Sequence, residues 1–172
     1  MLIALYILGG IIVFVLFIAL ILPSKYAVEK TIEINAPADK CYDMVADLNN
    51  YRDWNPWSKM EPDAKKTVTG TPKTPGHSYE WVGKKIGHGM LTVKSVEPNR
   101  SAVIGLEFFK PFKSKADDTW SFSESGGKTK VTWNNAGGLP YPMARLMGPM
   151  IMKNLNKQFE EGLNNIKQAV EK

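Results

Sequence analysis

The segment that decides the fold is residues 142–170, PMARLMGPMIMKNLNKQFEEGLNNIKQAV. Its apolar side chains recur three or four residues apart, at Met147, Ile151, Leu155, Phe159, Leu163, Ile166 and Val170. This spacing places them on one face of an α-helix. A helix over these residues is about 42 Å long at ~1.5 Å per residue, long enough to lie across a whole curved sheet. The sequence therefore predicts a long amphipathic helix here.

Short runs of β-forming residues, separated by turn formers such as Thr-Pro-Gly at 74–76 and Ser-Gly-Gly at 125–127, precede this helix. The runs are Lys66–Gly70, Ser78–Val82, Gly89–Val96, Ala102–Phe109, Ala116–Ser123 and Thr129–Asn134. Strands of this length and spacing predict an antiparallel meander. Trp120 and Phe122 alternate with the polar Thr119 and Ser121, so one face of the sheet is expected to be solvated.

A further strand and a short helix are predicted before the meander. Residues 28–35, VEKTIEIN, alternate between apolar and polar side chains, which is typical of a half-buried strand. Asn35 and Pro37 then suit a helix start, and apolar residues follow at helical spacing from Cys41 to Leu48. One strand, small helices, an antiparallel meander and a long helix together predict an α+β helix-grip fold.

Residues 1–24 differ from the rest of the chain, because all 22 Lys and Arg and all 17 Asp and Glu lie at or beyond Lys25. Leu2–Leu22 would form a helix of about 30 Å, enough to cross a bilayer core. A buried core helix would usually carry a polar face, and a signal peptide a basic start and a small-residue cleavage site. The expectation is a transmembrane anchor over 1–24, in the membrane through residues 2–22, followed by one soluble domain over 25–172.

The charges near the anchor suggest its orientation. Lys25, Lys30 and Lys40 follow the apolar run, and the positive-inside rule then favours a single-pass protein with a cytoplasmic domain. The single cysteine, Cys41, excludes an internal disulfide but fits either compartment. The formal net charge is +5, yet the basic residues form no block or recognised nucleic-acid motif. Nucleic acid is therefore not an expected partner.

Six segments carry a resemblance to a known family. They are Val28–Pro37, Asp47-Leu48, Trp54-Asn55-Pro56-Trp57, Val96–Asn99, Leu106–Phe108 and Gly126–Trp133. In this order and spacing the sequence resembles the polyketide cyclase/dehydrase-like branch of the START-related superfamily, often called SRPBCC, over nearly all of 26–172. Membrane-anchored members of this branch are similar to the present arrangement.

The resemblance implies a curved antiparallel sheet wrapped around a long C-terminal helix, with an apolar cavity between them. Members of the family bind lipids, sterols, polyketides, quinones or plant hormones, and only some are enzymes. The fold alone therefore does not decide the function. Four of the eight methionines lie between Met143 and Met152, and flexible thioethers suit variable apolar ligands, although they also fill gaps in ordinary cores.

The expected ligand-binding residues are those that strand parity or the helix pattern directs inward, together with two tryptophans near the expected cavity mouth. They are Trp54, Trp57, Tyr79, Trp81, Leu106, Phe108, Trp120, Phe122, Trp133, Met143, Met147, Met150, Ile151 and Leu155. Trp54 and Trp57 either gate a ligand or plug the end of the barrel, and plugging is the favoured role. Tyr hydroxyl and indole N–H groups suit the polar part of an otherwise apolar ligand.

Asp118 is the weak candidate for a catalytic residue, because parity places it on the side of Trp120 and Phe122. Buried there, its carboxyl would have a raised pKa and could act as acid or base. The favoured interpretation is that the regular strand begins after it, which leaves it solvated at the rim. His77 and His88 have no neighbours at metal-ligand spacing, so neither a metal nor a cofactor is expected.

Three functions remain open from the sequence. The leading hypothesis is a membrane-anchored domain that binds an apolar small molecule, such as a lipid, a quinone or a polyketide-like compound, in a cavity under the long helix. The second is a cyclase or dehydratase that uses general acid/base chemistry in the same cavity, with Asp118, Tyr79, His77 or His88 as its acid or base. The third is a protein-interaction module with a vestigial pocket and a filled core.

Overall fold

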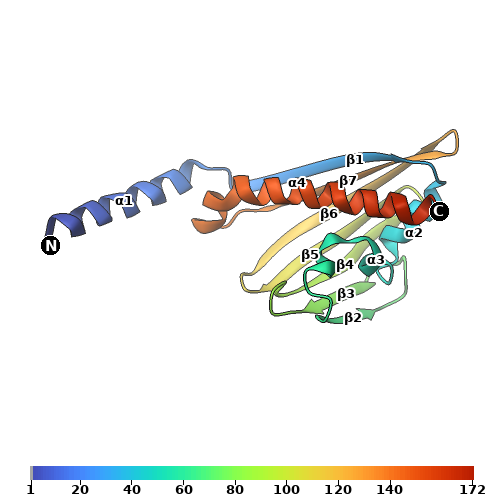
Figure 1. Cartoon of the computed structure of the whole chain (residues 1–172), viewed down its shortest axis with the longest axis horizontal. Coiled ribbons are helices and arrows are strands. Elements are labelled where there is room, and N and C mark those ends of the chain that lie inside the picture. Colours follow the sequence, from blue (N-terminus) through green and yellow to red (C-terminus); the bar gives the residue numbers. More distant parts are fainter. Residues whose placement is uncertain (1) are drawn as a thin grey trace.

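The computed structural model describes residues 2–172, in which an apolar helix precedes a sheet and a long C-terminal helix (Figure 1). The elements are α1 (Leu2–Ile21), β1 (Lys25–Ile34), α2 (Ala38–Ala46), α3 (Tyr51–Trp54), the 3-10 helix η1 (Pro56–Lys59), β2 (Lys65–Thr69), β3 (Ser78–Val82), β4 (His88–Glu97), β5 (Ser101–Lys110), β6 (Ser114–Ser125), β7 (Lys128–Gly138) and α4 (Met143–Val170). The predicted α+β helix-grip architecture is confirmed.

The seven strands form one antiparallel sheet in the order β1-β7-β6-β5-β4-β3-β2. Strands β2 to β7 follow one another as a meander, and β1 then pairs with β7 along its whole length, from Lys25 opposite Gly138 to Ile34 opposite Thr129. The inner face carries large apolar side chains from neighbouring strands, such as Trp120 opposite Trp133. The first and the last strand therefore lie side by side at one edge of the sheet, and α4 packs against β1 there.

Helix α4 crosses the inner face of the sheet and buries its C-terminal half (Figure 1). Phe159, Leu163 and Ile166 are fully enclosed there. Gly162 permits the close approach, because a Cβ atom at this position would lie 3.1 Å from Cζ3 of Trp133 and 3.5 Å from a ring atom of Trp54. The dense core thus occupies the end of the grip near α2 and α3, and the N-terminal half of α4 lies over a less filled region.

Helix α1 projects away from this domain, and nearly all its side chains are exposed (Figure 1). An 18-residue window within Leu2–Ile21 has a mean hydropathy of 3.0, which is enough by length and composition to cross a membrane. A signal sequence has the same properties. Ala19, near the end of α1, is the one buried residue of this helix.

Candidate functional site

A cavity of about 780 Å³ lies between the sheet and the N-terminal half of α4. Apolar side chains dominate its wall: Tyr79, Trp81, Leu91, Leu106 and Phe108 come from β3, β4 and β5, and Met147, Ile151, Leu155 and Phe159 from α4. Small-molecule sites in proteins commonly enclose 300–1,000 Å³ and are mostly apolar. The cavity therefore has the size and the character of a site for an apolar small molecule.

Ten of the fourteen residues predicted to bind a ligand line this cavity. They are Trp57, Tyr79, Trp81, Leu106, Phe108, Trp133, Met143, Met147, Ile151 and Leu155. Strand parity and helical spacing thus place them around one space. Their contact with a ligand stays a prediction.

Four of the predicted residues do not line the cavity. Trp54, Trp120 and Phe122 are buried in the dense core: Trp54 packs edge-on against Trp120 at 5.6 Å between ring centroids, and Phe122 against Tyr42 at 5.8 Å. Met150 is 51% exposed, because it lies one residue before Ile151 and thus ~100° around α4 from the wall. Parity identifies the inner face of a strand, but the core covers part of that face.

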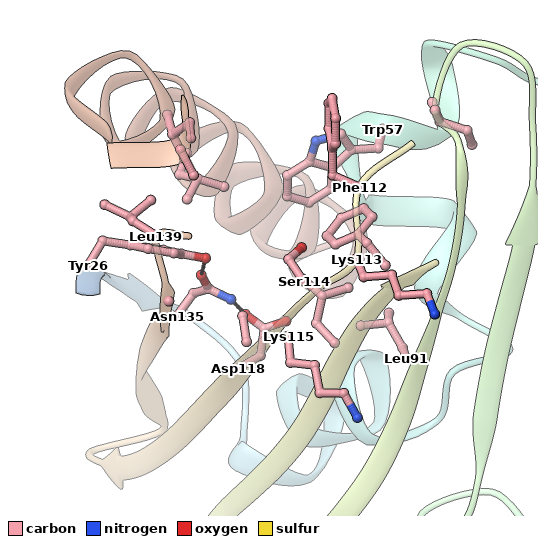
Figure 2. A pocket seen from close by; sticks show the side chains of 18 of the residues that line it. Tyr26, Trp57, Leu91, Phe112, Lys113, Ser114, Lys115, Asp118, Asn135 and Leu139 are labelled. Carbon is pink, nitrogen blue, oxygen red and sulfur yellow. Dashed lines mark hydrogen bonds between the residues drawn. The ribbon is translucent and has the colours of Figure 1, made fainter. Parts of the chain in front are cut away.

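A chain of three polar side chains interrupts the apolar wall (Figure 2). The Tyr26 hydroxyl donates to Oδ1 of Asn135 at 2.7 Å, and Nδ2 of Asn135 donates to Oδ1 of Asp118 at 2.9 Å. Nε1 of Trp133 donates to the same Asp118 oxygen at 2.8 Å. Both donors converge on one carboxyl oxygen, Oδ1, and Asp118 itself lines the cavity. Within residues 2–172, no hydrogen bond is formed to the second oxygen, Oδ2.

Asp118 is buried, with 7% of its surface exposed, and not solvated at the rim as the sequence suggested. Strand β6 begins at Ser114, four residues before it, so Asp118 faces inward in regular pairing opposite Asn135. The adjacent Asp117 is the solvated one and forms an ion pair with Lys94. Burial raises the pKa of Asp118 to about 6, against the opposing effect of the hydrogen bonds from Trp133 and Asn135.

The two histidine candidates lie outside the cavity wall. His77 is fully buried, where its Nε2 accepts the backbone N–H of Leu48 at 3.0 Å and its Nδ1 donates to the carbonyl of Thr69 at 2.9 Å. His88 pairs with Glu80 at 2.7 Å on a partly exposed surface. Both rings therefore hold loops and strands together. Of the four acid/base candidates, Asp118 and Tyr79 are the two that reach the cavity.

The raised pKa of Asp118 predicts a pH-dependent stability. Since the folded chain binds this proton more tightly than the unfolded chain, the contribution is present below pH 4 and is lost as the pH rises through about 6. The loss is about 3 kcal/mol. Urea unfolding between pH 4 and 7, followed by tryptophan fluorescence, is expected to show this fall in the wild type relative to Asp118→Asn. Parallel curves for the two proteins would contradict it.

Comparison with solved structures confirms the fold. Protein CV1439 from Chromobacterium violaceum superposes with a TM-score of 0.63 at 12% identity, over 85% of this chain and 97% of that one. The protein XoxI from Bacillus cereus gives 0.62 at 12% identity, over 84% and 94%. Ara h 8.0201 gives 0.60 at 10% identity, over 85% and 97%. At these identities the similarity concerns the fold alone.

The polar chain was not predicted from the sequence, because Tyr26 and Asn135 are 109 residues apart and meet only through the pairing of β1 with β7.

No curated protein matches this chain in sequence. The family described as polyketide cyclase / dehydrase and lipid transport matches residues 25–171, which confirms the resemblance carried by the sequence motifs, and the chain therefore belongs to this family.

Proposed function

We propose that the protein is a membrane-anchored binding domain that holds one apolar small molecule in the cavity beneath α4. One observation carries the proposal: a largely apolar cavity of about 780 Å³ has a single buried carboxyl group, that of Asp118, on its wall. An apolar wall with few placed polar groups binds the body of a ligand by burial and orients it by hydrogen bonding.

The ligand class follows from this division of the wall. The aromatic and methionine side chains suit a ring system or an acyl chain, and methionine adapts its shape to either. Asp118, held in place by Asn135 and Trp133, presents Oδ2 to one polar group of the ligand. Near pH 6 this carboxyl exists in both protonation states, so it can donate to a carbonyl or accept from a hydroxyl. A lipid, a quinone or a polyketide-like molecule meets these conditions.

The anchor is the second part of the proposal. Helix α1 has 20 residues without one charged side chain, and its exposed apolar side chains lack a protein surface to cover them. Retained in a bilayer, α1 would hold the cavity where apolar molecules concentrate. Lys25, Lys30 and Lys40 favour a cytoplasmic position for the domain.

A second function has one observation in its favour, the raised pKa of Asp118 at the cavity wall. A carboxyl group that is partly protonated near neutral pH can serve as a general acid or base on a bound polyketide-like ring. In that case Asp118→Asn would abolish turnover while the ligand still binds. The third possibility, an interaction module, requires a filled core, and the open cavity weighs against it.

Native mass spectrometry of the full chain tests the binding function. The protein is purified in mild detergent, incubated with an extract of membrane lipids and quinones, and released from the micelle in the gas phase. We expect one adduct per chain, because the cavity holds a single molecule, whereas lipids on α1 give a range of stoichiometries. A chain that carries no 1:1 adduct before or after incubation would contradict the proposal.

A further inference from the structure

Five large apolar side chains line the cavity and are also exposed; one is Met60, after η1, and the other four lie in the β5–β6 turn and around the start of α4. Phe112, Tyr141, Met143 and Met147 are 82%, 44%, 63% and 41% exposed. Phe112 lies in the turn between β5 and β6, and the other three at the start of α4 and just before it. We call these four residues the rim. Exposed apolar side chains gathered around one opening are typical of a contact surface in a folded protein.

The rim lies at the end of the domain to which α1 is joined. The Tyr141 hydroxyl donates to the backbone carbonyl of Leu16 in α1 at 3.3 Å. Nη1 of Arg145, in the first turn of α4, donates to the carbonyls of Ala19 and Leu20, each at 3.4 Å. In Figure 1, α1 leaves from the side at which the start of α4 and the β5–β6 turn lie. The rim therefore lies at the end of the domain from which α1 projects.

The contact with Leu16 sets the depth of the rim relative to α1. Leu16 lies five residues before Ile21, the end of α1, which is about 7.5 Å back along the helix axis. Apolar faces of interfacial helices enter the boundary between headgroups and acyl chains to about 5–10 Å. If α1 spans the bilayer as proposed above, Tyr141 lies at this depth.

The charges beside the rim suit a lipid surface. Lys110, Lys113 and Lys115 flank Phe112 in and beside the β5–β6 turn, and Lys113 itself lines the cavity. The charge of Lys115 is offset by an ion pair with Glu107, with 2.9 Å between Nζ and Oε1. Lysines near a bilayer surface are each attracted to anionic headgroups by ~1 kcal/mol. Apolar side chains beside lysines match acyl chains below a layer of phosphate groups.

We propose that the rim docks into the bilayer leaflet that α1 enters, so that the cavity opens directly onto the lipid phase. The inference rests on the anchor and the cavity of the proposed function and adds the route to the cavity: the ligand enters from the leaflet between Phe112 and the start of α4. A second copy of this chain is the competing occupant of the rim.

The depth of the rim is measured by spin labelling of the full chain in vesicles of phosphatidylcholine and phosphatidylglycerol. Cys41 is buried, and Cys41→Ala gives a background without cysteine. Phe112→Cys and Met143→Cys place labels on the rim, and Ser125→Cys places one at the exposed end of β6 as the control. Collision rates with oxygen report lipid exposure, and rates with a water-soluble nickel chelate report water exposure.

We expect oxygen collisions to exceed nickel collisions several-fold at positions 112 and 143, with the reverse at 125. Nickel-dominated collisions at the rim, in a chain that resists alkaline extraction, would overturn the docking and leave the anchor standing. Dipolar broadening between rim labels would also overturn it, in favour of a second copy. Release of the chain by alkali would overturn the anchor and the docking together. Ligand binding is tested separately, by the 1:1 adduct in native mass spectrometry.

Discussion

The 1:1 ligand adduct is expected to fall roughly tenfold or more in the double variant Ala116→Trp/Ile151→Trp. Ala116 lies on β6 and Ile151 on α4, and both line the cavity. Ala116 shares the inward face of β6 with Asp118, so an indole at 116 extends from the sheet while an indole at 151 extends from the helix. Two large rings from opposite walls divide the space, and no part remains long enough for a ring system or an acyl chain. Native mass spectrometry after incubation with the lipid and quinone extract gives the occupancy.

The matched control is Thr119→Trp, which places the same side chain on the exposed face of the same strand. It is expected to keep the adduct. The double variant is expected to keep its thermal unfolding midpoint, because added rings in a cavity gain contacts with its wall. A folded double variant with the adduct of the wild type would show that the ligand lies elsewhere on the chain. An equal loss of the 1:1 adduct in Thr119→Trp would also show that the ligand does not lie in the cavity.

The fold was predictable because its signals are local. Alternation along Ser78–Val82 marks a strand over the same residues in the structure, and the three-to-four spacing in 142–170 marks α4, which begins at Met143. Both patterns arise because one side of a helix or strand is buried and the other is exposed. The alternation of apolar and polar residues along the element itself shows this. The pairing of β1 with β7 joins strands about 100 residues apart in the sequence, and no local pattern predicted it.

The candidate site was predictable only in its apolar part. Helical spacing and strand parity select Ile151 and Leu106, but they do not separate the residues around an empty space from those in a filled core, such as Trp120. Asp118 shows the same limit for polar groups. The adjacent Asp117 and Asp118 are typical of the solvated end of a strand. The hydrogen-bond partner of Asp118, Asn135, belongs to another strand.

Trp133→Ala is expected to reduce the free energy of unfolding by about 4 kcal/mol. Trp133 is 2% exposed and lies between two rings, with its centroid 3.8 Å from that of Phe159 and 4.4 Å from that of Trp120. It links α4 to the sheet at the wall of the cavity. Alanine removes both stacking contacts and one of the two donors to Asp118, so the pKa of this carboxyl is expected to rise further.

Trp133→Phe separates packing from hydrogen bonding, since it keeps an aromatic ring between Phe159 and Trp120 but has no N–H group for Asp118. We expect it to lose about 1–2 kcal/mol, the usual cost of removing one donor to a buried acceptor, with part of that loss recovered below pH 5. Urea unfolding of the full chain in detergent, followed by circular dichroism of the sheet, measures both variants. A loss in Trp133→Ala no larger than that in Trp133→Phe would mean that the stacked rings contribute little, and that α4 is held to the sheet mainly by the side chains around Leu163 and Ile166.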